Sequence, residues 1–460
     1  MRQSLLPRRS SKSAYPMNPD TIITRFAPSP TGFLHAGNYR TAIFAYLCAK
    51  RSPRGTFILR IEDTDKERSK KEYEDNIIET LAWLGITPDQ MFRQSEHSGR
   101  HRELLEKLIA EGHAYRSAET PTEENRRSEV IRFRNPNIPV TFTDVIRGPI
   151  TMDTTDLGDF VIARSIDEPV FHFAVVVDDA DEGISHVIRG EDHISNTPRQ
   201  ILIQRALGVP TPVYAHLPLV FGPDRTKLSK RRGAKALTEY RDLGYLPEAL
   251  INYLALLGWH PENNQELFSL EELLQVFNLS RIQKSSGIFD ETKLLWYNAE
   301  HLKRLSSEAF ETVLRDYLQR EGSSVPEYLE KIIPLLQERS TTLKEAADAL
   351  GNGEFSFFKE APITPELLIK GAKTDAETAK RHLAHLETLL IDIPESAWGA
   401  GFLKEQLFGY ADQEGRGAVL WPLRTALSGK ERSPDPFTLL ALLGKQESLA
   451  RIGKAITALV

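Results

Sequence analysis

The stretch "TRFAPSPTGFLHAGNYRTAIFAYL", residues 24–47, contains a short apolar run, two prolines, Gly32, His35 and Gly37, and then a periodic helix. A second apolar run, "GTFILRIED" at residues 55–63, is nearly continuous, which is typical of a strand buried on both faces. Strand, helix and strand in close succession predict a βαβ unit, and such units form parallel sheets with right-handed crossovers. The stretch therefore predicts an α/β fold.

The composition is that of an ordinary globular protein. The chain has 460 residues, of which 40% are hydrophobic and 27% charged, and its net charge is −6. This length predicts about two to four domains. No apolar run approaches the roughly 18 residues that span a bilayer, so no membrane partner is expected. The single cysteine, Cys48, excludes an internal disulfide and a multi-cysteine zinc site, and it fits a reducing compartment.

Outside the first βαβ unit the sequence pattern changes three times. Residues 104–168 are short and irregular, with "FRNPNIPVTFTDVIRGPI" predicted as hairpins, which indicates an insertion into the α/β domain. Beyond residue 241 nearly everything is predicted to be helical. The first 19 residues carry Arg and Lys but no acid. An organellar presequence, a disordered tail and an over-extended start before Met17 all stay open for them.

The first candidate site follows the first strand. "SPTGFLHAGN" leaves that strand and enters the helix from Asn38, and the N–H groups of a helix N-terminus favour an anion. Gly32 and Gly37 would let a phosphate approach the backbone, and His35 adds a donor for developing negative charge. The plainer interpretation is a glycine turn with an ordinary surface histidine, because Gly and Pro are first of all turn formers.

Charged residues also follow two later strands. In "RIEDTD" (60–65), Glu62 and its acidic neighbours could receive an ammonium group, hold Mg²⁺ or contact a ribose; capping of the next helix is the simpler alternative. In "VIRGEDH" (187–193), Arg189 suits bidentate pairing with a carboxylate ligand, or else an internal salt bridge. Ligands of parallel sheets bind at the carboxyl ends of strands, where both segments are placed.

A third candidate is the segment "DRTKLSKRRG" (224–233), which holds five basic residues in ten. Lys227 and Lys230 could place their charges on a polyphosphate during attack at the α-phosphorus, whereas a solvated basic loop is the alternative. Three histidines lack metal-ligand spacing and are expected to be structural or minor contributors: His172, His186 and His193.

In this order, "RFAPSPTGFLHAGN", "RIEDTD", "VIRGEDHISNTPRQ" and "KLSKRRG" resemble the motifs of bacterial-type glutamyl-tRNA synthetases, which are class I aminoacyl-tRNA synthetases. "HAGN" stands where the class carries its His-x-Gly-His signature, and "KLSKR" where it carries its Lys-x-Ser-Lys loop. The resemblance continues through "KLLWYNAEHLKRL" (293–305) and "GAVLWPLRTALSG" (417–429), so it covers essentially residues 21–460.

The resemblance implies an α/β fold class: a Rossmann-type parallel-sheet catalytic domain with an inserted α+β acceptor-end domain, followed by an all-helical C-terminal half. The implied domains are a basic tail at 1–20, the catalytic domain at 21–103 and 169–240, the acceptor-binding insert at 104–168, a helical stem-contact domain at 241–315, and a helical anticodon-binding domain at 316–460.

The resemblance also implies the reaction and its partners. Glutamate attacks the α-phosphorus of ATP, which is accompanied by Mg²⁺, and the glutamyl group then passes from the adenylate to the terminal adenosine of tRNA-Glu. Charging of tRNA-Gln as well is left open, and the first step usually needs bound tRNA in this family. Such a displacement needs mainly positioning and cations. A cytoplasmic monomer is expected, with organellar import as the alternative.

Individual residues take their expected roles from the matching motifs. The glutamate pocket is expected to comprise Arg25, Ala27, Ser29, Glu62, Phe171 and Arg189. ATP is expected to contact His35, Gly37, Asn38, Thr64, Asp192, Lys227, Ser229 and Lys230. Among these, His35, Gly37, Lys227 and Lys230 are the residues implied in catalysis.

Three departures from the family pattern are visible. Asn38 replaces the second signature His but can still donate a hydrogen bond, and Phe171 stands where a Tyr is expected, so one hydroxyl contact to glutamate is missing. "HAYRSAET" (113–120) lacks the zinc-binding cysteines of some members, so no structural zinc is expected. The rival interpretations are a small-molecule nucleotidyltransferase, a glutamyl-queuosine tRNA synthetase-like enzyme, which lacks the helical half, and a non-catalytic tRNA-binding paralogue.

Overall fold

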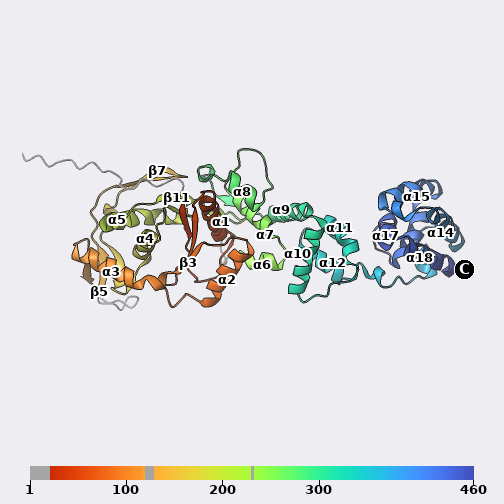
Figure 1. Ribbon diagram of the computed structural model, residues 1–460, viewed down its shortest axis with the longest axis horizontal. Coiled ribbons are helices and arrows are strands. Elements are labelled where there is room, and N and C mark those ends of the chain that lie inside the picture. The colour runs from red at the N-terminus through yellow and green to blue at the C-terminus, as the bar shows by residue number, and fades with distance from the viewer. Residues whose placement is uncertain (1–20, 120–128, 229–232, 460) are drawn as a thin grey trace, which may run out of the picture. The chain divides into compact units, whose positions relative to one another are not determined.

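The computed structural model describes residues 21–119, 129–228 and 233–459 (Figure 1). The expected basic tail at 1–20 lies outside these residues. The chain divides into two compact units, residues 1–301 and 302–460. Each unit is described below by itself.

A seven-stranded sheet forms the centre of the first unit, in the order β3-β2-β1-β10-β11-β6-β7. The strands from β3 to β6 pair in parallel, and β6 and β7 form an antiparallel hairpin at the edge. Because β1 lies between β2 and β10, the strand order reverses there, which is where open α/β sheets bind ligands. The strands are β1 (Ile23–Phe26), β2 (Thr56–Ile61), β3 (Gln90–Arg93), β6 (Val140–Asp144), β7 (Gly148–Met152), β10 (His186–Gly190) and β11 (Val213–Leu217).

The predicted βαβ unit is confirmed as β1, helix α1 (Ala36–Lys50) and β2. The first turn of α1 is fixed by a reciprocal cap in which Nδ1 of His35 accepts from the Gly37 amide and Oδ1 of Asn38 accepts from the His35 amide. A reciprocal cap of this kind satisfies backbone N–H groups that the start of a helix otherwise leaves unpaired. The cap explains why the helix begins at Ala36, two residues before the predicted Asn38.

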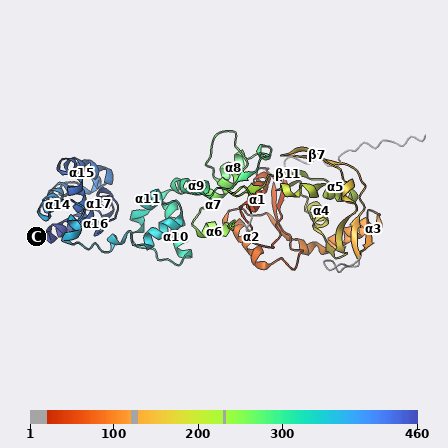
Figure 2. The same ribbon diagram turned by 180° about the vertical axis from the view of Figure 1, so that it is seen from behind.

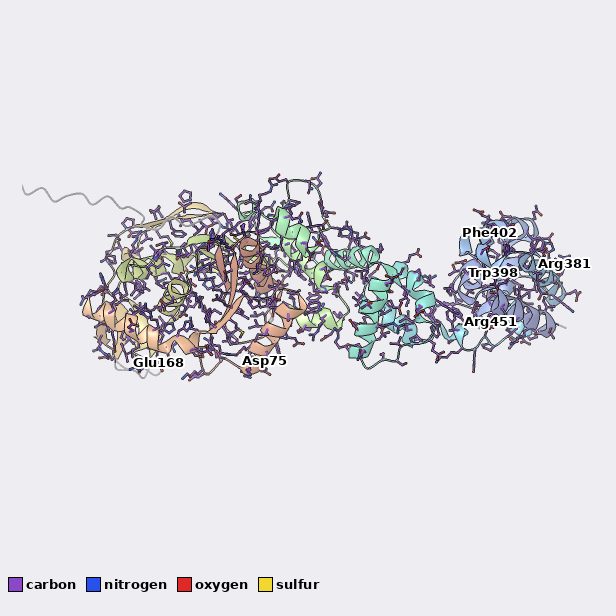
Figure 3. All side chains as sticks on the ribbon, in the orientation of Figure 1. Asp75, Glu168, Arg381, Trp398, Phe402 and Arg451 are labelled. Carbon is purple, nitrogen blue, oxygen red and sulfur yellow. The ribbon has the colours of Figure 1, made fainter. Side chains whose placement is uncertain are left out.

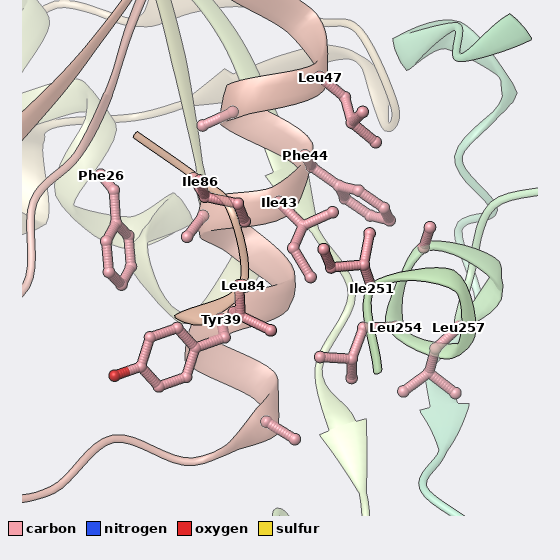
Figure 4. Close-up of a cluster of buried hydrophobic side chains, with 14 of the residues drawn as sticks. Phe26, Tyr39, Ile43, Phe44, Leu47, Leu84, Ile86, Ile251, Leu254 and Leu257 are labelled. Atoms are coloured by element: carbon pink, nitrogen blue, oxygen red, sulfur yellow. The ribbon is translucent and has the colours of Figure 1, made fainter. Parts of the chain in front are cut away.

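Both faces of the sheet are buried, as the continuous apolar run of β2 predicts. Phe57, Leu59 and Ile61 belong to a core shared with α1 and α7 (Pro247–Leu256), while Ile58 belongs to a second core. Figure 4 shows Ile43, Phe44 and Leu47 of α1 against Ile251 and Leu254 of α7. The second core is made with α3 (Ser98–Ala110), α4 (Phe171–Asp181) and α5 (Thr197–Leu207).

The predicted insertion, residues 104–168, contains α+β structure, but it is not separate from the main sheet. Four strands of this part of the chain form their own antiparallel sheet, in the order β4-β5-β8-β9. The β6–β7 hairpin instead joins the main sheet, where Asp144 of β6 pairs with Tyr214 of β11. The break at residue 104 falls inside α3. The small sheet consists of β4 (Ala114–Ala118), β5 (Glu129–Phe133), β8 (Phe160–Ser165) and β9 (Glu168–Pro169).

The chain beyond residue 241 is mostly helical, as predicted, except that β13 (Gly287–Ile288) pairs with β12 (Val220–Phe221). The remaining helices of the first unit are α2 (Lys71–Trp83), α6 (Leu237–Asp242) and α8 (Leu270–Val276), and α9 (Glu291–Arg304) contains the division between the units. None of the helices described here is long and apolar enough to cross a lipid bilayer.

Helices are the only regular secondary structure in the described part of the second unit, residues 302–459 (Figure 2). Its core buries side chains such as Trp398, labelled in Figure 3, whose Nε1 donates to the Leu440 carbonyl at 2.8 Å. The helices are α10 (Ser307–Arg320), α11 (Leu329–Arg339), α12 (Leu343–Gly351), α13 (Pro365–Ile369), α14 (Ala376–Ile391), α15 (Ala400–Glu414), α16 (Arg416–Ser428), α17 (Pro436–Leu443) and α18 (Lys445–Ala458).

Candidate active site

A cleft of about 410 Å³ opens at the carboxyl ends of β1 and β10, where the strand order reverses. Most of the residues predicted for the site line this single cleft. They come from both sides of the reversal and from α4: Arg25, Ala27, Ser29, His35, Gly37, Asn38, Glu62, Phe171, Arg189, Asp192 and Lys227.

The start of α1 fixes the imidazole of His35 at the wall of the cleft. Its Nδ1 accepts the Gly37 amide at 3.1 Å, so a neutral ring carries its proton on Nε2 and uses that nitrogen as donor. A Cβ on Gly37 would lie 3.0 Å from His35 Cε1, which explains the need for glycine there. The side-chain oxygen of Asn38 is used by the His35 amide at 3.1 Å.

Arg189, at the end of β10, is a buried cation whose hydrogen-bond acceptors among the described residues are all neutral. Its side chain donates to His216 Nε2 at 3.2 Å, to Thr197 Oγ1 at 2.9 Å and to Gln200 Oε1 at 2.8 Å. Within residues 21–119, 129–228 and 233–459, no carboxylate lies within 4.0 Å of its guanidinium nitrogens. Burial lowers the pKa of Arg189 to about 10. Asp179 and Glu62 act on it only from a longer distance, so a carboxylate entering the cleft would supply the directly bonded opposite charge.

Arg25 and Glu62 flank the cleft from β1 and from the end of β2. Arg25 donates through Nε to Asp179 of α4 at 3.0 Å, and both side chains are buried. The Glu62 amide donates to the Pro28 carbonyl at 3.0 Å, which holds the loop after β2 against the loop after β1. The site therefore combines a buried carboxylate with buried guanidinium groups, a combination suited to a zwitterion.

Glu62 belongs to a buried network around Arg60 of β2. Burial, the largest cause, raises the pKa of Glu62 to about 7, although the charges of Arg60 and Arg25 lower it. Burial would also raise the pKa of Asp179, but the same two arginines bring it below its usual range. The carboxylates within 4.0 Å of Arg60 are Glu62, Asp178, Asp179 and Glu182.

Lys227 reaches the cleft from a tight turn after β12. The turn is closed by the Gly222 amide, which donates to the Thr226 carbonyl at 2.9 Å. Lys227 Nζ lies 2.8 Å from Asp192 Oδ2, and this hydrogen bond lowers the pKa of Asp192, against the raising effect of burial. The predicted Ser229 and Lys230 lie outside the described residues.

Thr64 and Phe171 have different places relative to the cleft. Thr64 is exposed and donates to Gln94 Oε1 at 3.1 Å, and it is absent from the residues that line the cleft. Phe171 lines the cleft with its ring centroid 5.5 Å from that of His193. His193 lines the cleft as well, and burial followed by the charge of Arg189 lowers its pKa to about 4, so the ring is neutral.

Sequence reasoning missed several residues of this site. Arg40 of α1 lines the cleft, although its Nη1 is used by the Leu257 carbonyl at 2.9 Å. Its only signal is its place three residues after Gly37, about one helical turn further along the chain. Asp179 and His216, which hold Arg25 and Arg189, gave no signal, because they lie 154 and 27 residues from their partners.

The cleft contains no set of metal ligands by geometry. Among the described residues, no group of three or more His, Cys, Asp or Glu side chains is placed to hold a metal ion. Mg²⁺ needs few protein ligands when it travels with nucleotide phosphates, because it keeps several waters. Asp192 offers the carboxylate oxygen that this ion prefers.

Two protein families match nearly the whole chain. Residues 21–129 and 120–296 match the family described as "tRNA synthetases class I (E and Q), catalytic domain", and residues 298–456 match "Anticodon binding domain". The change from one family to the other falls within α9, which also contains the division between the two units. The first match contains every described residue that lines the cleft.

Individual relatives agree with the family. The chain is 42% identical to the glutamate–tRNA ligase of Aquifex aeolicus over 94% of this chain and 98% of that protein, and 41% identical to glutamate–tRNA ligase 1 of Acidithiobacillus ferrooxidans over 95% and 99%. A crystal structure of a glutamate tRNA ligase from Elizabethkingia meningosepticum in complex with its amino acid superposes with a TM-score of 0.79, at 32% identity, covering 95% of this chain and all of that one. The chain belongs to the class I tRNA synthetases of the E and Q family, with a catalytic domain followed by an anticodon-binding domain.

Proposed function

We propose that this protein is a glutamate–tRNA ligase, which activates L-glutamate with ATP and transfers it to the 3′-terminal adenosine of tRNA. The observation that carries the proposal is Arg189, a buried guanidinium at the wall of the cleft with neutral acceptors behind it. Such a group is costly to bury unless a ligand supplies the opposite charge. An amino acid with two carboxylates and one ammonium group fits a cleft lined by Arg25, Glu62 and Arg189.

In the proposed complex, the guanidinium groups of Arg189 and Arg25 pair with substrate carboxylates, and Glu62 accepts the ammonium group. Glu62 must be ionised for this role, and its raised pKa of about 7 puts that ionisation near neutral pH. Ala27 and Ser29 follow β1 and line the same part of the cleft. The charged side chains that hold the amino acid are already ordered in the folded protein, so binding does not have to order them.

In the proposed activation step, a carboxylate oxygen of glutamate attacks the α-phosphorus of ATP, and the bond to the bridging oxygen of pyrophosphate breaks. His35, through Nε2–H, and Lys227 are the proposed donors to the phosphate oxygens, together with Lys230 and Ser229 outside the described residues. Gly37 and Asn38 shape the helix start that faces the nucleotide. Mg²⁺ supplies charge neutralisation on the phosphates when it is bound.

The roles of the remaining domains are part of the same proposal. The insert at 104–168 is assigned to the acceptor end of tRNA, the segment 241–315 to the stem and the segment 316–460 to the anticodon. The match of residues 298–456 to an anticodon-binding family supports the last assignment. A helical unit of this kind does not favour the rival nucleotidyltransferase or a queuosine-modifying enzyme, which have no use for it. The protein is proposed to act as a monomer.

The decisive experiment is aminoacylation of separate tRNA-Glu and tRNA-Gln transcripts with radiolabelled glutamate and ATP. Charging of tRNA-Glu alone identifies a discriminating enzyme, and charging of both identifies a relaxed one. Pyrophosphate exchange with and without tRNA serves as the control for the activation step. If neither transcript is charged, the proposed function is wrong.

A further inference from the structure

Arg189 is held from behind by a small set of buried polar groups that do not themselves reach the cleft. His216 of β11 accepts from Nε of Arg189 at 3.2 Å, and Thr197 and Gln200 of α5 accept from the same Nη2 at 2.9 and 2.8 Å. Arg189 lines the cleft, but His216, Thr197 and Gln200 do not. His216 and Gln200 can therefore influence a bound substrate through the guanidinium of Arg189. Thr197 has a second route, because its hydroxyl also bonds to the carbonyl of His193, a residue of the cleft, at 3.2 Å and lies 3.1 Å from His216 Nε2.

The opposite nitrogen of His216 is fixed by Asp144, at the end of β6. Nδ1 of His216 lies 2.7 Å from Asp144 Oδ2, which also accepts the His216 amide at 2.9 Å. The other carboxylate oxygen accepts the amides of Ile146 and Arg147 at 2.9 and 2.8 Å. Both side chains are fully buried, so solvent water cannot take the place of either hydrogen-bond partner.

These contacts select one tautomer of His216. Burial would raise the pKa of Asp144, but the hydrogen bonds from His216 and from two backbone amides lower it, so the carboxylate is ionised and only accepts. Nδ1 of His216 must then donate, which leaves Nε2 as an acceptor facing the N–H of Arg189. The other tautomer would place two N–H donors against each other.

We propose that His216 is a positioning residue, held in one tautomer by Asp144, that fixes the guanidinium of Arg189 in the pose that receives a substrate carboxylate. This inference rests on the proposed function, in which Arg189 binds glutamate. It gives the insert at 104–168 a part in amino-acid recognition, because Asp144 belongs to that segment. A purely structural role for the same buried network is the alternative.

Two substitutions separate the two hydrogen bonds of His216. The amide of Asn in His216→Asn can reach the place of Nδ1 and keep Asp144 satisfied, but it leaves Arg189 Nε without an acceptor. The longer amide in His216→Gln reaches the place of Nε2 and keeps the acceptor for Arg189. The readout is the KM for glutamate and for ATP, together with kcat, in pyrophosphate exchange supported by tRNA-Glu.

His216→Asn is expected to raise the KM for glutamate about tenfold or more, because a loosened guanidinium binds carboxylate in poorer geometry. The KM for ATP and kcat should change by less than about threefold, and His216→Gln should restore most of the affinity for glutamate. His301→Asn is the matched control. This buried histidine bonds to Asn252 at 2.9 Å away from the cleft, and its substitution should leave the KM for glutamate unchanged.

Thermal unfolding of each variant identifies losses caused by misfolding. If His216→Asn does not fold, Gln200→Leu removes another acceptor of the same guanidinium and should raise the KM for glutamate about threefold. An unchanged KM for glutamate in the folded variants, or equal losses in His216→Asn and His216→Gln, would overturn this inference alone. If the wild type shows no glutamate-dependent exchange, the proposed function fails and the inference fails with it.

Discussion

Arg60 on β2 and Arg189 on β10 belong to the two strands that flank β1, and both side chains are almost completely buried, at 0% and 7% exposure. Arg60 has four carboxylates within 4.0 Å, and their charges raise its pKa although burial opposes this. Arg189 has only neutral acceptors among the described residues, and burial lowers its pKa to about 10. The first charge is neutralised within the fold, whereas the second lines a cleft and is available to a ligand.

The difference teaches how to separate structural charge from functional charge. A buried ion that is already paired stabilises the fold only if its partners stay in place, and removal of one partner leaves the others uncompensated. A buried ion without a paired charge weakens the fold, so its presence needs another explanation, and the one proposed here is recognition of substrate. Substitutions at the two arginines should therefore act on different properties.

Arg60→Met is expected to have the largest effect, and the effect is on stability. The loss of the cation leaves four buried carboxylates without their shared partner, which should lower the free energy of unfolding by about 3–5 kcal/mol. Urea unfolding of the purified protein measures it. The loss should be smaller at pH 5 than at pH 8, because the uncompensated carboxyl groups can then take up protons. An unfolding free energy equal to that of the wild type would remove the distinction between the two arginines.

Arg189→Met is expected to lower kcat/KM for glutamate by about 100- to 1,000-fold, which corresponds to about 3–4 kcal/mol of lost binding to a buried charge. The free energy of unfolding should change by less than about 2 kcal/mol, because only neutral hydrogen bonds are lost inside the fold. Tryptophan fluorescence during urea unfolding and steady-state pyrophosphate exchange measure the two quantities. A large loss of unfolding free energy with an unchanged kcat/KM for glutamate would show that Arg189, like Arg60, serves the fold and not the substrate.

Glu62 links the network of Arg60 to the cleft and predicts a pH dependence. Its pKa in the fold is about 7, and only the ionised form pairs with an ammonium group. The kcat/KM for glutamate should therefore fall about tenfold for each pH unit below 7 and level off above it. Glu62→Gln should have a lower kcat/KM at pH 8 and lose this slope. A wild-type profile that is flat from pH 6 to 8 would contradict the proposed role of Glu62.

Phe171→Tyr is expected to have the smallest effect. Phe171 lines the cleft beside His193, and an added hydroxyl offers glutamate one more neutral hydrogen bond, worth about 1–1.5 kcal/mol at most. The KM for glutamate should fall while the unfolding free energy stays the same. Phe173→Tyr is unsuitable as a control because that ring is fully buried in the core. An unchanged KM for glutamate would mean that a hydroxyl at this position makes no hydrogen bond to the amino acid.

The sequence was sufficient to predict the convergence of Arg25, Glu62 and Arg189, because each lies at or directly after the carboxyl end of a strand of one parallel sheet, and such strand ends meet at one edge. It was also sufficient for the helix that follows His35, since Gly37 and Asn38 are local to it. The assigned roles of these residues stay predictions. So do those of Ser229 and Lys230, outside the described residues.

The supporting groups were not predictable, because they depend on contacts between distant segments. Arg60 stands in an apolar strand, and three of its acidic partners come from the helix α4 region, 118–122 residues later. Asp144 meets His216 only because the β6–β7 hairpin of the insert joins β11, and a hairpin signal does not say which sheet the hairpin joins. Local patterns predict elements, whereas the charge balance of the core depends on tertiary pairing.

The cap at the start of α1 has a consequence for the cost of binding. The imidazole of His35 is held by the Gly37 amide, so its rotational freedom is lost when the chain folds and not when the proposed nucleotide binds. Ordering of a mobile side chain on association costs about 0.5–1.5 kcal/mol. The hydrogen bond that starts the helix thus transfers this entropy loss from binding to folding, and the donor nitrogen is already oriented before any substrate enters the cleft.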